Sequence, residues 1–118
     1  MKTARINLAY LEEITGGDKA AMKMILQSFL DNSPKDIQKL KSAIASEDFP
    51  STAQIAHKLK SNFQYIGDES SAKLLKQMQI FAETSKNAKR IGEIMATIDQ
   101  NYTNALAEVK TACKEITD

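Results

Sequence analysis

The sequence predicts an all-α protein: an antiparallel, up-down four-helix bundle with a short additional N-terminal helix laid across one end. Three observations support this prediction. Apolar residues recur at helical spacing along most of the chain, and no segment has the alternation typical of a strand. Only four glycines and two prolines interrupt the 118 residues. The connections between the expected helices are short, which favours antiparallel neighbours.

A short helix and a longer one are expected at the start of the chain. Asn7 can cap the first, which runs to about Ile14. Asp18 can cap the second, which ends near Asn32. The apolar face predicted for this second helix consists of Ala21, Met24, Ile25, Ser28 and Phe29.

A third helix is expected directly after the second. Ser33 and Pro34 are the residue types preferred at an N-cap and at the first helical position, so they predict a new helix that runs to about Ser46. Its apolar face would consist of Ile37, Leu40, Ile44 and Ala45.

The next predicted helix is the central one. Asp48 or Ser51 can start it, and Gly67 offers a left-handed C-terminal cap. Its apolar positions are Ile55, Ala56, Leu59, Phe63 and Ile66. Two amphipathic helices complete the chain, one from about Glu69 to Thr84 and one that begins at about Ala88.

Size and charge narrow the function. A chain of 118 residues has little room for a second core, so we expect a single domain over residues 1–118. The 16 basic and 15 acidic residues give a formal net charge of +1 and are interleaved, so there is no broad positive field for nucleic acid or anionic lipid. We therefore expect no nucleic-acid partner and no membrane partner, and no segment is apolar enough to span a membrane or to serve as a signal peptide.

Cys113 is the only cysteine. A single cysteine cannot form an intramolecular disulfide or a cysteine-based zinc site. It fits a reducing compartment, so we expect a cytoplasmic protein.

His57 is the only histidine, and its helical position points it away from the apolar face. Each residue advances the helical wheel by about 100 degrees, which places His57 far from that face. Lys60, Ser61 and Gln64 follow three, four and seven residues later and share its side of the helix. The sequence therefore predicts a solvent-facing histidine beside a lysine.

Two interpretations of this pair are open. A lone surface histidine commonly has no function, and Lys60 can be an ordinary solvated lysine. Alternatively, His57 is a nucleophile, because a neutral imidazole nitrogen attacks readily near neutral pH. Lys60 would then supply a positive charge about one helical turn away, suited to a transferring phosphoryl group.

Gln79 is expected to lie beside His57. If the chain reverses around Gly67, the two residues lie at similar distances before and after the turn, and so at the same height on adjacent antiparallel helices. The Gln79 amide could bond the imidazole or a phosphoryl oxygen, because it can donate or accept. The simpler alternative is an ordinary glutamine at the boundary of the core.

The segment IAHKLKSNFQYIG, from Ile55 to Gly67, resembles the signature of histidine-containing phosphotransfer domains. An alanine precedes the histidine, a leucine and a lysine follow at its second and third positions, and a glycine closes the helix ten residues on. The resemblance extends through most of the chain to about Phe81.

The resemblance implies a carrier in a phosphorelay. His57 would be the phosphoacceptor, Lys60 would stabilise the phosphoryl group, and Gln79 would orient the imidazole or the phosphoryl group. The partners would be response-regulator receiver domains, of a hybrid sensor kinase and of a downstream regulator. The receiver would supply the magnesium ion, so we expect no cofactor on this chain, no autonomous enzyme activity, and a monomer. Met1 lies close to the first expected helix, which favours a free-standing protein over a domain of a hybrid kinase.

The chain departs from the family pattern at one position near the site. The family usually has glycine directly after the lysine, where a small residue lets the receiver approach closely, and this chain has Ser61. Ile80 breaks the apolar register of its helix, so it is a candidate for the docking surface together with Ser61 and Gln64, although a packing residue at the helix boundary is the simpler interpretation.

Two other classes of function compete with the carrier. An interaction-only bundle that docks receivers without accepting phosphate would not need the pair of His57 and Lys60. A metal or cofactor enzyme is disfavoured, because one histidine and one cysteine cannot furnish a di-metal bundle site. Glu12 and Glu13 diverge on their helix and do not form a catalytic pair. The internal methionines are expected to fill the core: Met22, Met24, Met78 and Met95.

Overall fold

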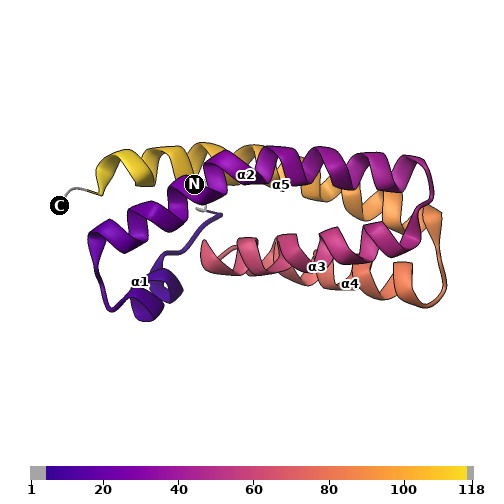
Figure 1. Cartoon of the computed structure of the whole chain (residues 1–118), viewed down its shortest axis with the longest axis horizontal. Helices are drawn as coiled ribbons and strands as arrows, with labels where there is room; N and C mark the ends of the chain where they lie inside the picture. The colour runs from indigo at the N-terminus through magenta and orange to yellow at the C-terminus, as the bar shows by residue number, and fades with distance from the viewer. Residues whose placement is uncertain (1–4, 117–118) are drawn as a thin grey trace.

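The computed structural model describes residues 5–116, and these form five helices (Figure 1). The helices are α1 (Ala9–Thr15), α2 (Lys19–Ala45), α3 (Phe49–Tyr65), α4 (Glu69–Glu83) and α5 (Ala88–Glu115). The four long helices run up and down as a bundle, and α1 lies at one end near the start of α2 (Figure 1). The predicted all-α bundle with a short N-terminal helix is confirmed. Met1 lies outside the described residues.

The predicted helix boundary at Ser33 and Pro34 is wrong, because α2 continues through both residues. The Ser33 hydroxyl does not cap a new helix. It bonds the carbonyl oxygen of Phe29 one turn earlier and lies 2.9 Å from the hydroxyl of Tyr102 on α5. Figure 1 shows a single helix whose first part is inclined toward α1.

Burial explains why α2 survives its proline. A proline inside a helix costs about 3 kcal/mol, because it removes one hydrogen bond and its ring crowds the preceding turn. Each fully buried apolar side chain contributes about 1.5–3 kcal/mol. The buried face of α2 spans both sides of Pro34 and includes Leu26, Phe29, Ile37 and Leu40. Four such side chains on one face outweigh the single proline.

The buried face of α2 is also shifted by about one residue from the prediction. Met24 is 73% exposed, so its predicted place in the core is wrong, whereas Met22, Met78 and Met95 are buried. Met24 lies two residues from both Met22 and Leu26, which places it on the opposite side of the helix. The face that packs is Met22, Leu26, Phe29 and Ser33, and in the second half Ala43 is buried while Ala45 is exposed.

The turn between α3 and α4 sets the height of one helix against the other. Gly67 has a φ of 77°, in the left-handed region, as predicted. Its N–H donates to the carbonyl of Gln64, and the N–H of Asp68 donates to that of Phe63, which is the Schellman pattern. A Cβ at Gly67 would also collide with the backbone of Asn7, which crosses this turn. Only glycine satisfies both conditions.

Four side chains cap the long helices at their N-termini. Asp18 accepts from the backbone of Ala20 and Ala21, and Asp48 accepts from Ser51, so Asp48 is the residue that starts α3. Asp68 caps α4 and Asn87 caps α5 in the same way.

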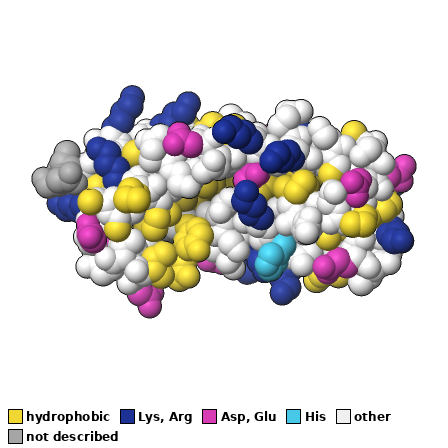
Figure 2. All heavy atoms as spheres, viewed as in Figure 1, with side chains coloured by type: hydrophobic (Ala, Val, Ile, Leu, Met, Phe, Trp, Pro, Cys, Tyr) yellow, Lys and Arg dark blue, Asp and Glu magenta, His cyan; other side chains and the backbone are white. Residues whose placement is uncertain are grey.

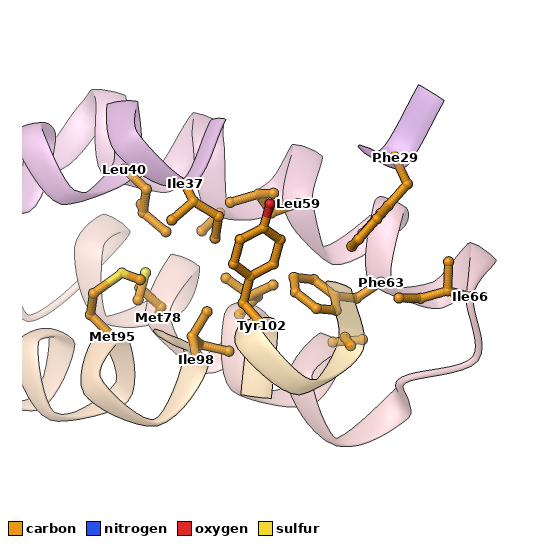
Figure 3. Packing of buried hydrophobic residues seen from close by; sticks show 14 of the residues in the cluster. Phe29, Ile37, Leu40, Leu59, Phe63, Ile66, Met78, Met95, Ile98 and Tyr102 are labelled. Carbon is orange, nitrogen blue, oxygen red and sulfur yellow. The ribbon is translucent and has the colours of Figure 1, made fainter. Parts of the chain in front are cut away.

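The core lies directly behind α3. Phe29, Phe63 and Tyr102 from α2, α3 and α5 form an aromatic cluster, with the rings of Phe29 and Phe63 edge to face at 5.7 Å (Figure 3). Leu59 is fully buried beside them. Because this packing fixes the rotation of α3, it also fixes which residues of α3 face outward.

Candidate functional site

His57 lies on the exposed face of α3, near the middle of the helix. Its neighbours Ala56 and Leu59 are fully buried on the opposite face. Figure 2 shows the one histidine, in cyan, at the surface of the molecule. Another protein can therefore reach its imidazole, as a nucleophile that serves a macromolecular partner requires.

Gln79 and His57 lie side by side across α3 and α4. The imidazole Nδ1 of His57 is 3.3 Å from Oε1 of Gln79. The α3–α4 turn therefore places the two residues at the same level along their antiparallel helices, as expected. Because Nδ1 faces Gln79 of the same chain, Nε2 is the ring nitrogen left for a partner protein.

Glu83 also belongs to this site, and the sequence analysis missed it. Gln79 Nε2 donates a hydrogen bond to Glu83 Oε2 at 3.3 Å. All three side chains line a shallow hollow of about 370 Å³ together with Pro50, Ala53 and Gln54. The signal that could have found Glu83 is its spacing of four residues from Gln79, which places both on one helix face.

The two lysines that follow His57 have different surroundings. Lys58 Nζ lies 3.2 Å from the carboxylate of Asp36, which is buried on α2. Lys60 is half-buried, and no carboxylate of residues 5–116 lies within ion-pair distance of it. Lys58 therefore links α3 to α2, whereas Lys60 forms no ion pair within residues 5–116.

The candidate docking residues lie around this centre. Gln64 is exposed and Ser61 is half-buried on α3. Within the described part of the chain the Ser61 hydroxyl makes no hydrogen bond. Ile80 follows Gln79 on α4 and is 46% exposed, which is unusual for an isoleucine in a packed bundle.

A second surface feature was not expected from the sequence. Tyr10 on α1 and Tyr65 on α3 stack with ring centroids 6.4 Å apart, and they are 45% and 39% exposed. Ile14 on α1 is also 44% exposed. Hydrophobic side chains gather over this end of the molecule in Figure 2. Tyr65 lies eight residues after His57, about 12 Å along α3.

The remaining candidates lie apart from His57. Glu12 and Glu13 are exposed on α1, and Cys113 is buried on α5. Among residues 5–116, no three His, Cys, Asp or Glu side chains gather into a group that could hold a metal ion. None of the helices in that range has both the length and the apolar character needed to cross a membrane.

Comparisons with known proteins bear on the family and the fold. The family model described as Hpt domain matches residues 24–115. The fold is similar to the crystal structure of histidine-containing phosphotransfer protein B (HptB) from Pseudomonas aeruginosa PAO1, with a TM-score of 0.86. The match covers 98% of this chain and 100% of that one at 14% sequence identity, so it shows a shared fold. No curated protein sequence matches the chain.

Proposed function

The chain belongs to the Hpt domain family, whose members are phosphocarriers, and we propose that His57 takes a phosphoryl group from the aspartate of one receiver domain and passes it to another. One observation carries the proposal above the others. The single histidine is exposed on the bundle, and its Nδ1 lies 3.3 Å from Gln79 Oε1, which leaves Nε2 as the ring nitrogen for the reaction.

The transfer step uses the lone pair of Nε2. It attacks the phosphorus of an aspartyl phosphate in line with the bond to the carboxylate oxygen. The new N–P bond forms as that P–O bond breaks, and the bonding electron pair leaves with the aspartate as a carboxylate. Nδ1 keeps its proton, so the ring gains a positive charge. The Nδ1–H donates a hydrogen bond to Gln79 Oε1, which stabilises this charge. The reverse reaction delivers the phosphoryl group to the second receiver.

Lys60 and the outer face of α3 assist this step. The Lys60 ammonium lies one turn beyond His57, where it offsets the charge of the phosphoryl oxygens as they pass. Ser61 and Gln64 on α3, with Ile80 on α4, form the surface that a receiver contacts around the histidine. The apolar tyrosine pair Tyr10 and Tyr65 extends this surface toward α1, because exposed apolar groups of this kind mark protein interfaces.

The groups in the site indicate which parts of the reaction this chain would supply and which the receiver would supply. His57 provides the nucleophile, and the residues around it provide orientation and one positive charge, so we assign no autonomous catalytic activity and no cofactor to the chain. The magnesium ion of the reaction would belong to the receiver. We place the carrier in the cytoplasm as a monomer, between a receiver of a hybrid sensor kinase and a downstream regulator. The described helices share one hydrophobic core, which supports a single domain.

The proposal is tested by mixing the chain with a phosphorylated receiver and then with a second, unphosphorylated one. We expect acid-labile phosphate to appear on the chain and then on the second receiver. An interaction-only bundle would bind the first receiver and acquire no phosphate. That result would overturn the carrier proposal and support the alternative.

A further inference from the structure

The two ends of the Gln79 amide have different partners. Oε1 faces the imidazole Nδ1 at 3.3 Å, and Nε2 donates to Glu83 Oε2 at 3.3 Å. We propose that Glu83 is a positioning residue: it holds the Nε2 end of the Gln79 amide and thereby sets the tautomer of His57 in which Nδ1 carries the proton. The inference deepens the proposed function and rests on it for its consequence in transfer.

Hydrogen-bond chemistry allows only one orientation of the amide. An ionised carboxylate has acceptors and no donor, whereas the amide has one end of each kind. If the amide were turned around, its oxygen would face the carboxylate oxygen of Glu83, and two acceptors would meet without a proton. Oε1 must therefore face His57. An acceptor at Nδ1 requires a proton on Nδ1, which leaves the lone pair on Nε2.

The position of Glu83 suits this role. It is the last residue of α4, four residues after Gln79, so the two side chains leave the helix on the same face. Both line the hollow that holds His57. Within residues 5–116, no lysine or arginine lies within ion-pair distance of the Glu83 carboxylate. The carboxylate is thus available to the amide.

The tautomer matters because water favours the other one. A free neutral imidazole side chain carries its proton mainly on Nε2, and in that form the outward nitrogen has no lone pair for attack. The hydrogen bonds that Gln79 makes with Glu83 and with His57 reverse this preference. Glu83 also places a negative charge behind the imidazole, where positive charge develops as the N–P bond forms.

The tautomer can be measured on the unphosphorylated protein without any receiver. Nitrogen-15 NMR of the single imidazole distinguishes a protonated ring nitrogen from one that bears a lone pair. In the wild-type protein we expect Nδ1 to be the protonated nitrogen. In Glu83→Gln the new amide can donate or accept, so it no longer dictates the orientation of the Gln79 amide. In Glu83→Asp the negative charge remains, but the side chain is shorter by one methylene and the carboxylate lies farther from Gln79. Both should shift the ratio toward the Nε2-protonated form by about two- to fivefold, the worth of one charge-assisted hydrogen bond on a helix face.

Two further variants separate positioning from charge. The double variant Gln79→Glu with Glu83→Gln moves the carboxylate to position 79, where both oxygens accept, and should restore the proton to Nδ1. Glu115→Gln, at the exposed end of α5, removes an equal charge away from His57 and should leave the ratio unchanged. Transfer from a phosphorylated receiver should slow in both Glu83 variants in proportion to the fraction of His57 that remains protonated on Nδ1.

The outcomes are distinct. A wild-type His57 protonated mainly on Nε2, or ratios that neither Glu83 variant changes, would overturn the inference. Faster transfer in Glu83→Gln with unchanged transfer in Glu83→Asp would also overturn it, because Glu83 would then act only as a repelling charge. If the wild-type chain accepted no phosphoryl group, the proposed function would fail, and the tautomer ratios would still decide the role of Glu83.

Discussion

The hydroxyl of Tyr102 on α5 lies 2.9 Å from the hydroxyl of Ser33 on α2, one residue before the proline inside that helix. Both residues are buried. Burial raises the pKa of the Tyr102 hydroxyl, the Ser33 hydrogen bond lowers it, and the charge of Asp36 adds a further increase. The neutral tyrosine is therefore the form that the fold requires.

The contact between Tyr102 and Ser33 predicts how the stability of the fold changes with pH. The pKa of Tyr102 is higher in the folded than in the unfolded chain. The stabilisation from the neutral tyrosine is therefore complete when the pH is below the pKa of the unfolded state, and it is lost as the pH rises through the pKa of the folded state. Tyr102→Phe removes one hydrogen bond and should lower the free energy of unfolding by about 1 kcal/mol near pH 8. The difference from wild type should shrink as the solution becomes alkaline. Urea unfolding at a series of pH values measures it, and a constant difference would contradict the prediction.

Asp68 should contribute far more to stability than its counterpart Asp48. Each caps a helix and accepts from the N–H and hydroxyl of the serine three residues on. Asp68 is 1% exposed, and its serine, Ser71, also accepts from Asn101 on α5. Asp68→Ala should cost about 2–4 kcal/mol, from the lost cap and the buried donors left without a partner.

Asp48→Ala is the matched control for this change. The side chain and then the backbone of Ser51 lower the pKa of Asp48, so its contribution is present at neutral pH and is lost as pH falls through that lowered value. Its effect on unfolding should be the smaller of the two, since water can replace an exposed cap. Equal losses in the two variants would show that burial of Asp68 adds nothing.

Lys60→Ala should slow phosphoryl transfer more than it weakens receiver binding. In the proposed mechanism the ammonium would interact with charge that moves during the reaction, and among residues 5–116 it forms no ion pair within the bundle. Lys60→Arg should recover part of the rate, and Lys110→Ala, on the exposed side of α5, should have none of this effect. Rapid-quench transfer kinetics and titration of receiver binding provide the two readouts. Transfer that is unchanged in Lys60→Ala would return Lys60 to an ordinary surface lysine.

Ser61→Gly tests the departure from the family pattern. Glycine inside a helix costs about 0.5–1 kcal/mol relative to alanine, so this variant should be modestly less stable than wild type. The variant removes a half-buried side chain from the proposed docking face, so we expect it to accept phosphate from a wider panel of receivers. If the hydroxyl contacts the phosphoryl group instead, transfer from the native receiver should weaken. Identical rates across the panel would show that the departure has no functional consequence.

Helical periodicity was enough to predict where His57 and Gln79 lie. It placed His57 outward because Ala56, Leu59 and Phe63 define a clear buried face, and Gly67 fixed the turn that brings Gln79 alongside. These features depend on local spacing and on one turn.

The errors arose where tertiary packing overrides local signals. Ser33 and Pro34 have the local pattern of a helix start, but the buried face on both sides of them holds α2 together. The apolar residues between Met22 and Leu26 are compatible with two helix faces, and contact with the rest of the bundle selects the one without Met24. Glu83 and the stacked pair of Tyr10 and Tyr65 gain their meaning only from neighbours on the surface.

The most direct test compares wild-type protein with His57→Gln in phosphoryl acceptance from a labelled, phosphorylated receiver. His57 is exposed and makes one side-chain hydrogen bond, so the variant should unfold within about 0.5 kcal/mol of wild type. We predict acid-labile label on the wild-type chain and none on the variant. Label retained on a folded His57→Gln chain would contradict the assignment of His57 as the phosphoacceptor.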